Sequence, residues 1–248
     1  AQGLWNTNPF SLYNDGTYLY GRGVMDDKGP ILACLFALKA LKNAGIEPNI
    51  PIRIIFGCNE ESGSNDIKHY LKHEKPPLMG FSPDCQFPAV YSERGILRLK
   101  ISGLQAEMVE FCNRYMIGKD KKIMNHYLSA LDNAYGKVEV KQIELKMKKN
   151  KIHLEVKIWY PYQVEVKAVI DSLKAILKDD MEIGVIEDIS PMYVSKENDL
   201  VQLLSKAYGA ICDDDATPVV TSGATYAKVV PNIIPFGPSF NGKDNSRH

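Results

Sequence analysis

The stretch GRGVMDDKGPILACLFALKALKNAG, residues 21–45, places two adjacent aspartates between a short predicted strand and a run with helical spacing. Pro30 suits the first turn of a helix, where a missing backbone N–H is tolerated. The apolar residues of this helix recur every three or four positions and are Ile31, Leu32, Leu35, Leu38 and Leu41. Gly45 favours the end of the helix. The stretch therefore predicts a strand, an acidic turn and a helix, the pattern from which α/β domains are built.

The alternation of strands and helices continues after this helix. Residues 50–58, IPIRIIFGC, are apolar through their second half, as in a strand buried on both faces of a sheet. A helix is expected from Asp66 to Lys75, and residues 84–102 predict two strands joined by a turn. The order strand, helix, strand, helix, strand indicates the α/β fold class with a mainly parallel sheet.

From residue 102 the pattern changes to that of a small α+β domain. The expected elements are helices around 105–116 and 124–135, strands over 137–147 and 151–160, a helix over 166–177 and a strand over 181–188. The two alternating runs predict an antiparallel hairpin with one face in water. The first run changes face between Val140 and Ile143, which indicates a β-bulge.

These patterns predict a discontinuous α/β domain interrupted by an inserted domain. The α/β domain comprises residues 1–101 and 190–248, and the insert comprises residues 102–189. After the insert, a helix around 200–208 restores the α/β pattern. A strand that runs into the glycine turn TSGAT, residues 221–225, follows that helix.

Composition excludes several classes of protein. The chain of 248 residues has 30 basic and 30 acidic residues, so its net charge favours neither nucleic acid nor an anionic membrane surface. No apolar run approaches the ~20 residues that span a bilayer. The first residues, AQGLWNTNPF, show no leader pattern, so no signal peptide is expected. Five cysteines without a CxxC motif favour reduced thiols and hence a cytoplasmic location.

Acidic residues recur at the C-terminal ends of the predicted strands: Asp26, Asp27, Glu60, Glu61 and Asp84. Ligands bind at this edge of open α/β sheets. Carboxylates gathered there repel one another, and a divalent cation removes the conflict. Together with a histidine, such a set suits zinc or manganese better than magnesium. Taken singly, each acidic pair also fits a helix cap or a solvated surface.

Three stretches, in this order and spacing, resemble the co-catalytic zinc peptidases of the PepV-like dipeptidase group. They are YGRGVMDDKGP (20–30), FGCNEESGS (56–64) and GFSPDCQFPAVYSERG (80–95). Carnosinase, aminoacylases and succinyl-diaminopimelate desuccinylase belong to the same family. The resemblance implies a zinc-exopeptidase-like catalytic domain with an inserted α+β lid. It also implies a metallo-dipeptidase that acts on small peptides, and it is compatible with a homodimer.

The resemblance also implies roles for individual residues. The metal ligands are Asp26, which bridges two ions, Glu61, Asp84 and His248. Glu60 matches the general base, and Asp27 supports a turn in which the Asp26–Asp27 bond is cis. The cofactor would be two Zn²⁺ ions per site, with Mn²⁺ as the alternative. The residues expected to line the substrate site are Ser222, Gly223, Ala224 and Thr225.

Four departures from the family pattern leave alternatives open, one being that the family's C-terminal helix after the metal-binding histidine is missing. A histidine and an aspartate one residue apart, expected before LWNTNPF, are absent, and LQAEM (104–108) replaces a stretch with a histidine. Trp159 stands where the family has an arginine that holds the substrate carboxylate. Either these residues are portions of a longer polypeptide, or the chain is an inactive relative with a binding or structural role. A deacylase acting on N-acyl amino acids is the third reading.

His69 and His73 are four residues apart, which is a metal-ligand spacing on a helix. The segment KHYLKHEK around them is rich in lysine and histidine, and no acidic residue lies between the two histidines. The segment therefore favours a solvated helix face over a metal site.

Overall fold

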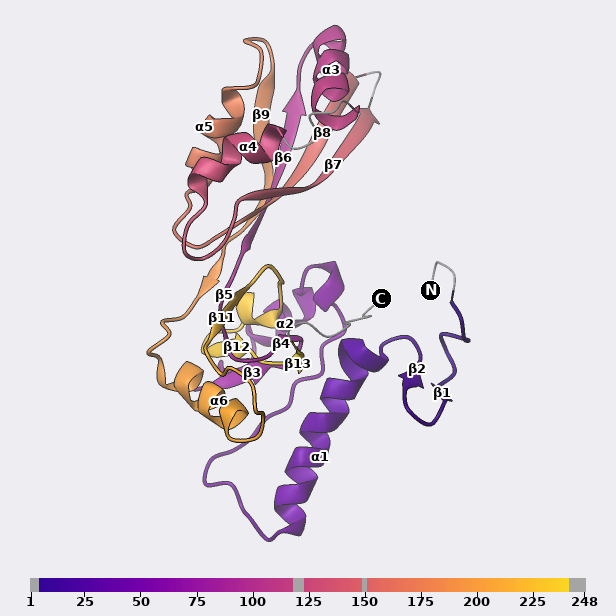
Figure 1. Cartoon of the computed structure of the whole chain (residues 1–248), viewed down its shortest axis with the longest axis vertical. Helices are drawn as coiled ribbons and strands as arrows, with labels where there is room; N and C mark the ends of the chain where they lie inside the picture. The colour runs from indigo at the N-terminus through magenta and orange to yellow at the C-terminus, as the bar shows by residue number, and fades with distance from the viewer. Residues whose placement is uncertain (1–4, 118–122, 149–150, 241–248) are drawn as a thin grey trace. The chain divides into compact units, whose positions relative to one another are not determined.

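The computed structural model describes residues 5–117, 123–148 and 151–240. The chain forms two compact units (Figure 1). The first comprises residues 1–90, 196–218 and 225–248, and the second comprises residues 91–195 and 219–224. The domain division at residues 102 and 189 stays a prediction.

In the described part of the first unit, short strand pairs accompany three α-helices. Its helices are α1 (Gly29–Asn43), α2 (Asn65–Tyr70) and α6 (Asp199–Gly209). Its strands are β1 (Tyr13–Asn14), β2 (Leu19–Tyr20), β3 (Gly80–Ser82), β4 (Cys85–Gln86), β12 (Ile233–Pro235) and β13 (Pro238–Ser239). β12 pairs with β3 and β13 with β4, both in parallel, whereas β1 and β2 form an antiparallel pair. The α/β class is thus confirmed.

The helix predicted after the double aspartate is α1, with Pro30 at its N-terminal end as expected. Pro30 is its only buried residue, and large apolar side chains on it are exposed, Phe36 at 62%.

The strand predicted over residues 50–58 was wrong. Residues 51–57 have no strand geometry, and Ile52 and Phe56 are 51% and 56% exposed. A parallel strand exists only while neighbouring strands satisfy its backbone N–H and C=O groups. Within the described residues no strand pairs with this segment. The helix expected from Asp66 is likewise shorter than predicted, since α2 ends at Tyr70.

The core of the first unit lies between α6 and the parallel strand pairs. Asn198 begins α6 by accepting a hydrogen bond from Leu200 N at 2.9 Å, as an N-cap does. Tyr208, near the end of α6, stacks on Phe87 with 5.2 Å between ring centroids. Gly237, with φ +73°, leaves room for the Phe87 ring where a Cβ would stand.

The second unit is an α+β structure. Its helices are α3 (Gln105–Cys112), α4 (Ile123–Leu128) and α5 (Val166–Lys174). Its strands are β5 (Val90–Glu93), β6 (Gly95–Ser102), β7 (Glu139–Lys148), β8 (Lys151–Tyr160), β9 (Glu182–Ile189), β10 (Met192–Tyr193) and β11 (Val219–Thr221). One sheet has the order β7-β8-β6-β9 and the other β10-β5-β11.

The predicted hairpin is confirmed as β7 and β8, which pair in antiparallel register from Glu139↔Trp159 onward. The predicted bulge is also present, between Val140 and Gln142. β6, which the sequence placed in the first domain, pairs with β8 and β9 in this sheet. Its alternate residues Leu97, Leu99 and Ile101 are fully buried against the helices.

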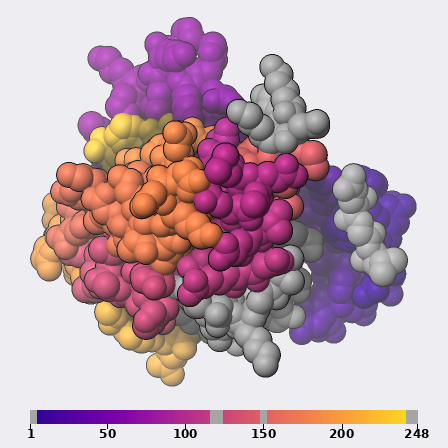
Figure 2. All heavy atoms as spheres, turned by 90° about the horizontal axis from the view of Figure 1, so that it is seen from above, coloured from indigo at the N-terminus to yellow at the C-terminus, as the bar shows by residue number. Residues whose placement is uncertain are grey.

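The helices cover the buried face of the four-stranded sheet. Met108 of α3, Leu128 of α4 and Val169 of α5 are each 0% exposed in the same core cluster. On the outside, Lys178 after α5 forms a 2.5 Å ion pair with Glu110 of α3. Figure 2 shows the side chains of these segments, orange and magenta, adjoining on the surface.

None of the helices described is long and apolar enough to cross a membrane.

Candidate active site

The acidic turn lies directly before α1. Its backbone closes through a 2.8 Å hydrogen bond from Lys28 N to Gly23 O, and Gly23 has a φ of +78° that favours glycine. The Asp26–Asp27 peptide bond is cis, as the family resemblance implies. Both aspartates are half-buried. The turn therefore holds two carboxylates at the N-terminal end of the helix.

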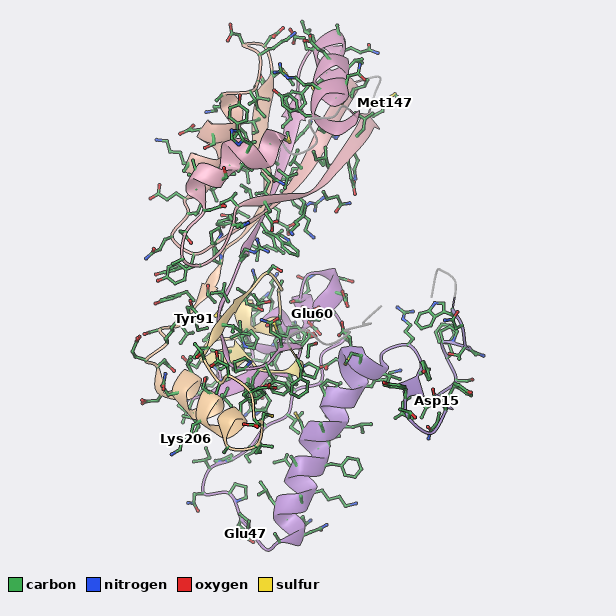
Figure 3. The ribbon with its side chains drawn as sticks, viewed as in Figure 1. Asp15, Glu47, Glu60, Tyr91, Met147 and Lys206 are labelled. Atoms are coloured by element: carbon green, nitrogen blue, oxygen red, sulfur yellow. The ribbon has the colours of Figure 1, made fainter. Side chains whose placement is uncertain are left out.

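The second acidic pair lies on a loop that is folded back on itself. Glu60 and Glu61 begin a 3-10 helix, Glu60–Ser62, and Glu60 is labelled in Figure 3. The carbonyl of Asn59 accepts hydrogen bonds from Ser62 N at 3.2 Å and from Ser64 N at 2.8 Å. The backbone thus fixes the loop on both sides of the glutamates.

The two acidic segments act on each other electrostatically. Burial, and then the charges of Asp26 and Glu60, raise the pKa of Asp27 to about 7. Burial, and then the charges of Glu61, Asp26 and Asp66, raise the pKa of Glu60 to about 7. The Oδ1 atom of Asp27 is buried and has no hydrogen-bond partner among the described residues. The fold therefore brings the turn and the loop together into one site with excess negative charge.

This donor set fits a divalent cation chemically, because half-buried carboxylates that repel one another are what such an ion neutralises. Geometrically, the described part of the chain holds no group of three or more His, Cys, Asp or Glu side chains placed to bind a metal ion. Asp84 lies half-buried between β3 and β4. His248 lies outside the described residues. The predicted ligand set therefore stays a prediction.

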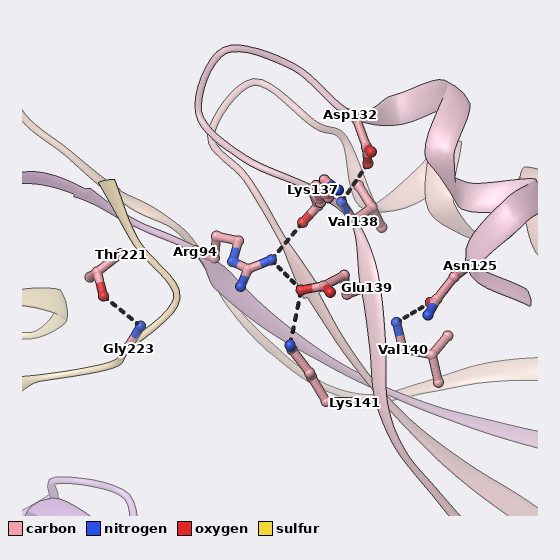
Figure 4. A network of polar contacts seen from close by, with 10 residues as sticks. All are labelled: Arg94, Asn125, Asp132, Lys137, Val138, Glu139, Val140, Lys141, Thr221 and Gly223. Atoms are coloured by element: carbon pink, nitrogen blue, oxygen red, sulfur yellow. Dashed lines mark hydrogen bonds and ion pairs between the residues drawn. The ribbon is translucent and has the colours of Figure 1, made fainter. Parts of the chain in front are cut away.

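The predicted substrate-site residues fall in both compact units. Ser222, Gly223 and Ala224 follow β11 in the second unit, where Gly223 N donates to Thr221 Oγ1 at 3.2 Å (Figure 4). Thr225 belongs to the first unit and is 4% exposed. Its Oγ1 accepts a 3.1 Å hydrogen bond from Ala227 N, which caps the 3-10 helix Tyr226–Lys228. Their role toward a substrate remains a prediction.

Trp159, which stands in the place of the family's arginine, packs against two cations. The Arg94 guanidinium lies 5.1 Å and the Lys141 ammonium 4.5 Å from its ring centroid. Glu139 joins the same two cations at 2.7 and 2.9 Å (Figure 4). In the second unit, Trp159 thus takes part in a charged cluster that organises one end of β7 and β8.

His69 and His73 lie on one exposed face, with 4.6 Å between ring centroids, and His73 Nδ1 is 3.0 Å from His69 O. This arrangement agrees with the solvated face that the sequence favours.

Sequence reasoning missed two residues beside the glutamates. The carboxylate of Asp66 accepts hydrogen bonds from Cys58 N at 2.6 Å, from Asn59 N at 2.9 Å and from the Tyr226 hydroxyl at 2.7 Å. Asp66 was expected only as the start of a helix, and Tyr226 carried no signal. Their partnership joins residues 160 apart in the chain, which no local pattern reveals.

Comparison with known proteins finds similarity along the whole chain. A family model described as Peptidase family M20/M25/M40 matches residues 1–248. "Putative dipeptidase YtjP" of Bacillus subtilis is 25% identical over 344 residues, covering 98% of this chain and 74% of the relative. This alignment is longer than the 248 residues of the chain, so the relative carries segments without a counterpart here. The Beta-Ala-Xaa dipeptidase of Lactobacillus delbrueckii is 41% identical over 99 residues, covering 40% of this chain but only 21% of that enzyme.

Solved structures with the same fold include two peptidases. A tripeptidase from Staphylococcus aureus superposes with a TM-score of 0.64 at 18% identity, covering 92% of this chain and 67% of that one. Human carnosine dipeptidase 1 superposes with a TM-score of 0.61 at 14% identity, covering 94% and 69%. At these identities the likeness concerns the fold.

Proposed function

Because the chain belongs to peptidase family M20/M25/M40, we propose that it hydrolyses the amide bond of dipeptides in a metal-dependent reaction. Relatives described as dipeptidases support the substrate class. The observation that carries the proposal is the meeting of Asp26 and Asp27 with Glu60, where burial first, and then neighbouring carboxylate charges, raise the pKa values of Asp27 and Glu60 to about 7. Such values suit groups that exchange protons near neutral pH.

The residues that would hold the metal are Asp26, Glu61, Asp84 and His248, with Zn²⁺ or Mn²⁺ as the ion. When bound, such an ion acidifies water and polarises a carbonyl group. Hard and borderline cations prefer the oxygen and nitrogen donors of this set. Asp27 would support the turn that presents Asp26.

Glu60 would act as the general base of the reaction. Its carboxylate would accept a proton from water and later donate it to the nitrogen of the departing amine, so the proton balance closes within one turnover. A base with a pKa near 7 holds and releases a proton with little cost at neutral pH. The amide carbon would gain the water oxygen and lose the amine.

Residues 102–189 would act as the inserted lid of the catalytic domain, which comprises residues 1–101 and 190–248. The residues along the substrate would be Ser222, Gly223, Ala224 and Thr225. Lids of this kind exclude water and position the substrate.

The test is zinc-dependent hydrolysis by the purified protein, with free dipeptides and their N-acetylated forms as substrates. Glu60→Gln removes the proposed base without changing size and should lower kcat by about 10²–10⁴-fold. Glu47→Gln is the control, since Glu47 is an exposed carboxylate after α1 (Figure 3) and should leave kcat unchanged. If kcat is unchanged in Glu60→Gln, Glu60 is not the general base. Hydrolysis confined to N-acetylated substrates would favour a deacylase.

A further inference from the structure

The Asp66 carboxylate accepts four hydrogen bonds from other groups of the protein. Its Oδ2 accepts three hydrogen bonds, from Cys58 N, Asn59 N and the Tyr226 hydroxyl, at 2.6, 2.9 and 2.7 Å. Its Oδ1 accepts a fourth from Ile67 N at 2.7 Å. Hydrogen bonds to an ionised acceptor are about twice as strong as neutral ones. One carboxylate therefore holds both ends of the loop that runs from residue 58 to residue 67.

The same loop carries Glu60 and Glu61. Asn59 connects them to the network, because its N–H donates to Asp66 and its Oδ1 accepts from Asn65 N at 2.9 Å. Lys68 Nζ donates to Gly63 O at 2.9 Å on the far side. The glutamates thus lie on a loop that is held by a network of hydrogen bonds, most of which end on the Asp66 carboxylate.

Tyr226 connects this hydrogen-bond network to a distant part of the chain. It begins the 3-10 helix Tyr226–Lys228, which follows the glycine turn. Its hydroxyl lies over Gly57, closer than any Cβ at that position would allow. The absence of a side chain at residue 57 is therefore required for Tyr226 to reach Asp66.

We propose that Asp66 is a positioning residue, which, with Tyr226 as its anchor, fixes the loop that carries Glu60 and Glu61. We use the word clamp for the Asp66 carboxylate together with the three groups that donate to its Oδ2: the Tyr226 hydroxyl and the N–H groups of Cys58 and Asn59. The inference rests on the proposed function, because the clamp affects catalysis only if Glu60 is the general base and Glu61 is a metal ligand. Misplacement of a reacting group by about 1 Å costs about a hundredfold in rate.

The variants are Asp66→Asn, Tyr226→Phe and the double variant. Asp66→Asn keeps size but replaces an acceptor oxygen by a donor, whereas Tyr226→Phe removes a single hydroxyl. The matched control is Tyr208→Phe, because the Tyr208 hydroxyl donates to a different aspartate of the same unit, Asp214 Oδ2, at 3.3 Å. Circular dichroism and thermal unfolding show whether each variant is folded, and Tyr226→Phe decides if Asp66→Asn is not.

Three measurements test the clamp. In Asp66→Asn we expect hydrogen exchange in residues 57–64 to accelerate, since the amides of Cys58 and Asn59 lose a charged acceptor and face either a neutral oxygen or an NH2 group. Zinc affinity should fall about tenfold, and kcat should fall about tenfold to a hundredfold while KM stays within about twofold. Tyr226→Phe should show the same changes to a smaller degree, and the double variant should be no worse than Asp66→Asn, because the two residues act through one network.

The outcomes distinguish a failure of the clamp from a failure of the proposed function. Unchanged exchange and zinc affinity in Asp66→Asn would overturn the clamp, as would effects of Tyr208→Phe equal to those of Tyr226→Phe. If the unaltered protein hydrolyses no dipeptide, the proposed function fails. Exchange and zinc affinity then still decide whether Asp66 holds the loop.

Discussion

The hydroxyl of Tyr226 lies where a Cβ on Gly57 would stand, so these two residues fit together only while residue 57 has no side chain. Gly57 is not in the left-handed region of backbone conformation, so its requirement is one of space. This relationship connects the loop of the glutamates with the segment after the glycine turn and leads to the first prediction.

Gly57→Ala should displace Tyr226 and destabilise the protein by about 1–3 kcal/mol, the usual cost of overpacking. It should also lower kcat in the same direction as Tyr226→Phe, although neither partner of the hydrogen bond is altered. Chemical unfolding and steady-state kinetics measure the two effects. Gly184→Ala is the control, because a Cβ there meets nothing within 4 Å. A Gly57→Ala protein with unchanged stability would contradict the fit.

The raised pKa values of Asp27 and Glu60, both about 7, predict how the metal-free protein responds to pH. Unfolded carboxyl groups release their protons near pH ~4, so the folded state binds more protons between that value and about 7. Their contribution to stability is therefore fully present below pH ~4 and is lost as pH rises through about 7.

In EDTA, Glu60→Gln should consequently be more stable than the unaltered protein at pH ~8, and the difference should vanish toward pH ~4. Differential scanning fluorimetry across this range gives the comparison, with Glu47→Gln as the matched variant that shows no such trend. Excess zinc should remove the advantage of the variant, because a cation stabilises the charged carboxylates. An advantage that grows toward acid pH would have the wrong sign.

The pKa of Asp66 is shifted in the opposite direction. Desolvation alone would raise its pKa, but hydrogen bonds from Tyr226 and from the backbone N–H groups of Cys58, Ile67 and Asn59 lower it to about 2. Its contribution to stability is present above the unfolded value of ~4 and is lost as pH falls through about 2. Tm measured below pH ~4 should therefore decline less in Asp66→Asn than in the unaltered protein. An equal decline in both proteins would show that the Asp66 carboxylate is not held in its charged form.

The sequence predicted those features that local patterns encode. Alternation of apolar and polar residues predicted the hairpin of β7 and β8 and the bulge after Val140, and helical spacing predicted α1 with Pro30 in its first turn. The cis bond before Asp27 came from family resemblance. Features set by partners distant in the chain were not predictable. The apolar run at 50–58 suggested a strand, although no described neighbour pairs with it, and the contact of Asp66 with Tyr226 left no trace in either segment.

Arg94 and Arg98 give a matched comparison of two arginines in the second unit whose side chains differ in exposure. The side chain of Arg94 is 11% exposed, and it donates to Lys137 O at 3.0 Å and Glu139 Oε2 at 2.7 Å while covering Trp159. Arg94→Met should therefore cost about 1–3 kcal/mol, since it removes two hydrogen bonds and the cation from a side chain that is itself largely buried. The side chain of Arg98 is 41% exposed, and its ion pairs with Glu155 and Glu187 at 3.1 and 3.5 Å are solvated.

Arg98→Met should accordingly cost only about 0–1 kcal/mol. Urea unfolding of both variants gives the two values, and raising the salt concentration should reduce the effect of Arg98→Met more than that of Arg94→Met, because exposed pairs are screened. In a Trp5→Phe background, where Trp159 is the single tryptophan, fluorescence adds a local readout, since Arg94→Met uncovers one side of its ring and should shift its emission to longer wavelength. Equal costs for the two arginines, with unchanged emission, would mean that the Trp159 cluster does not hold this end of the sheet.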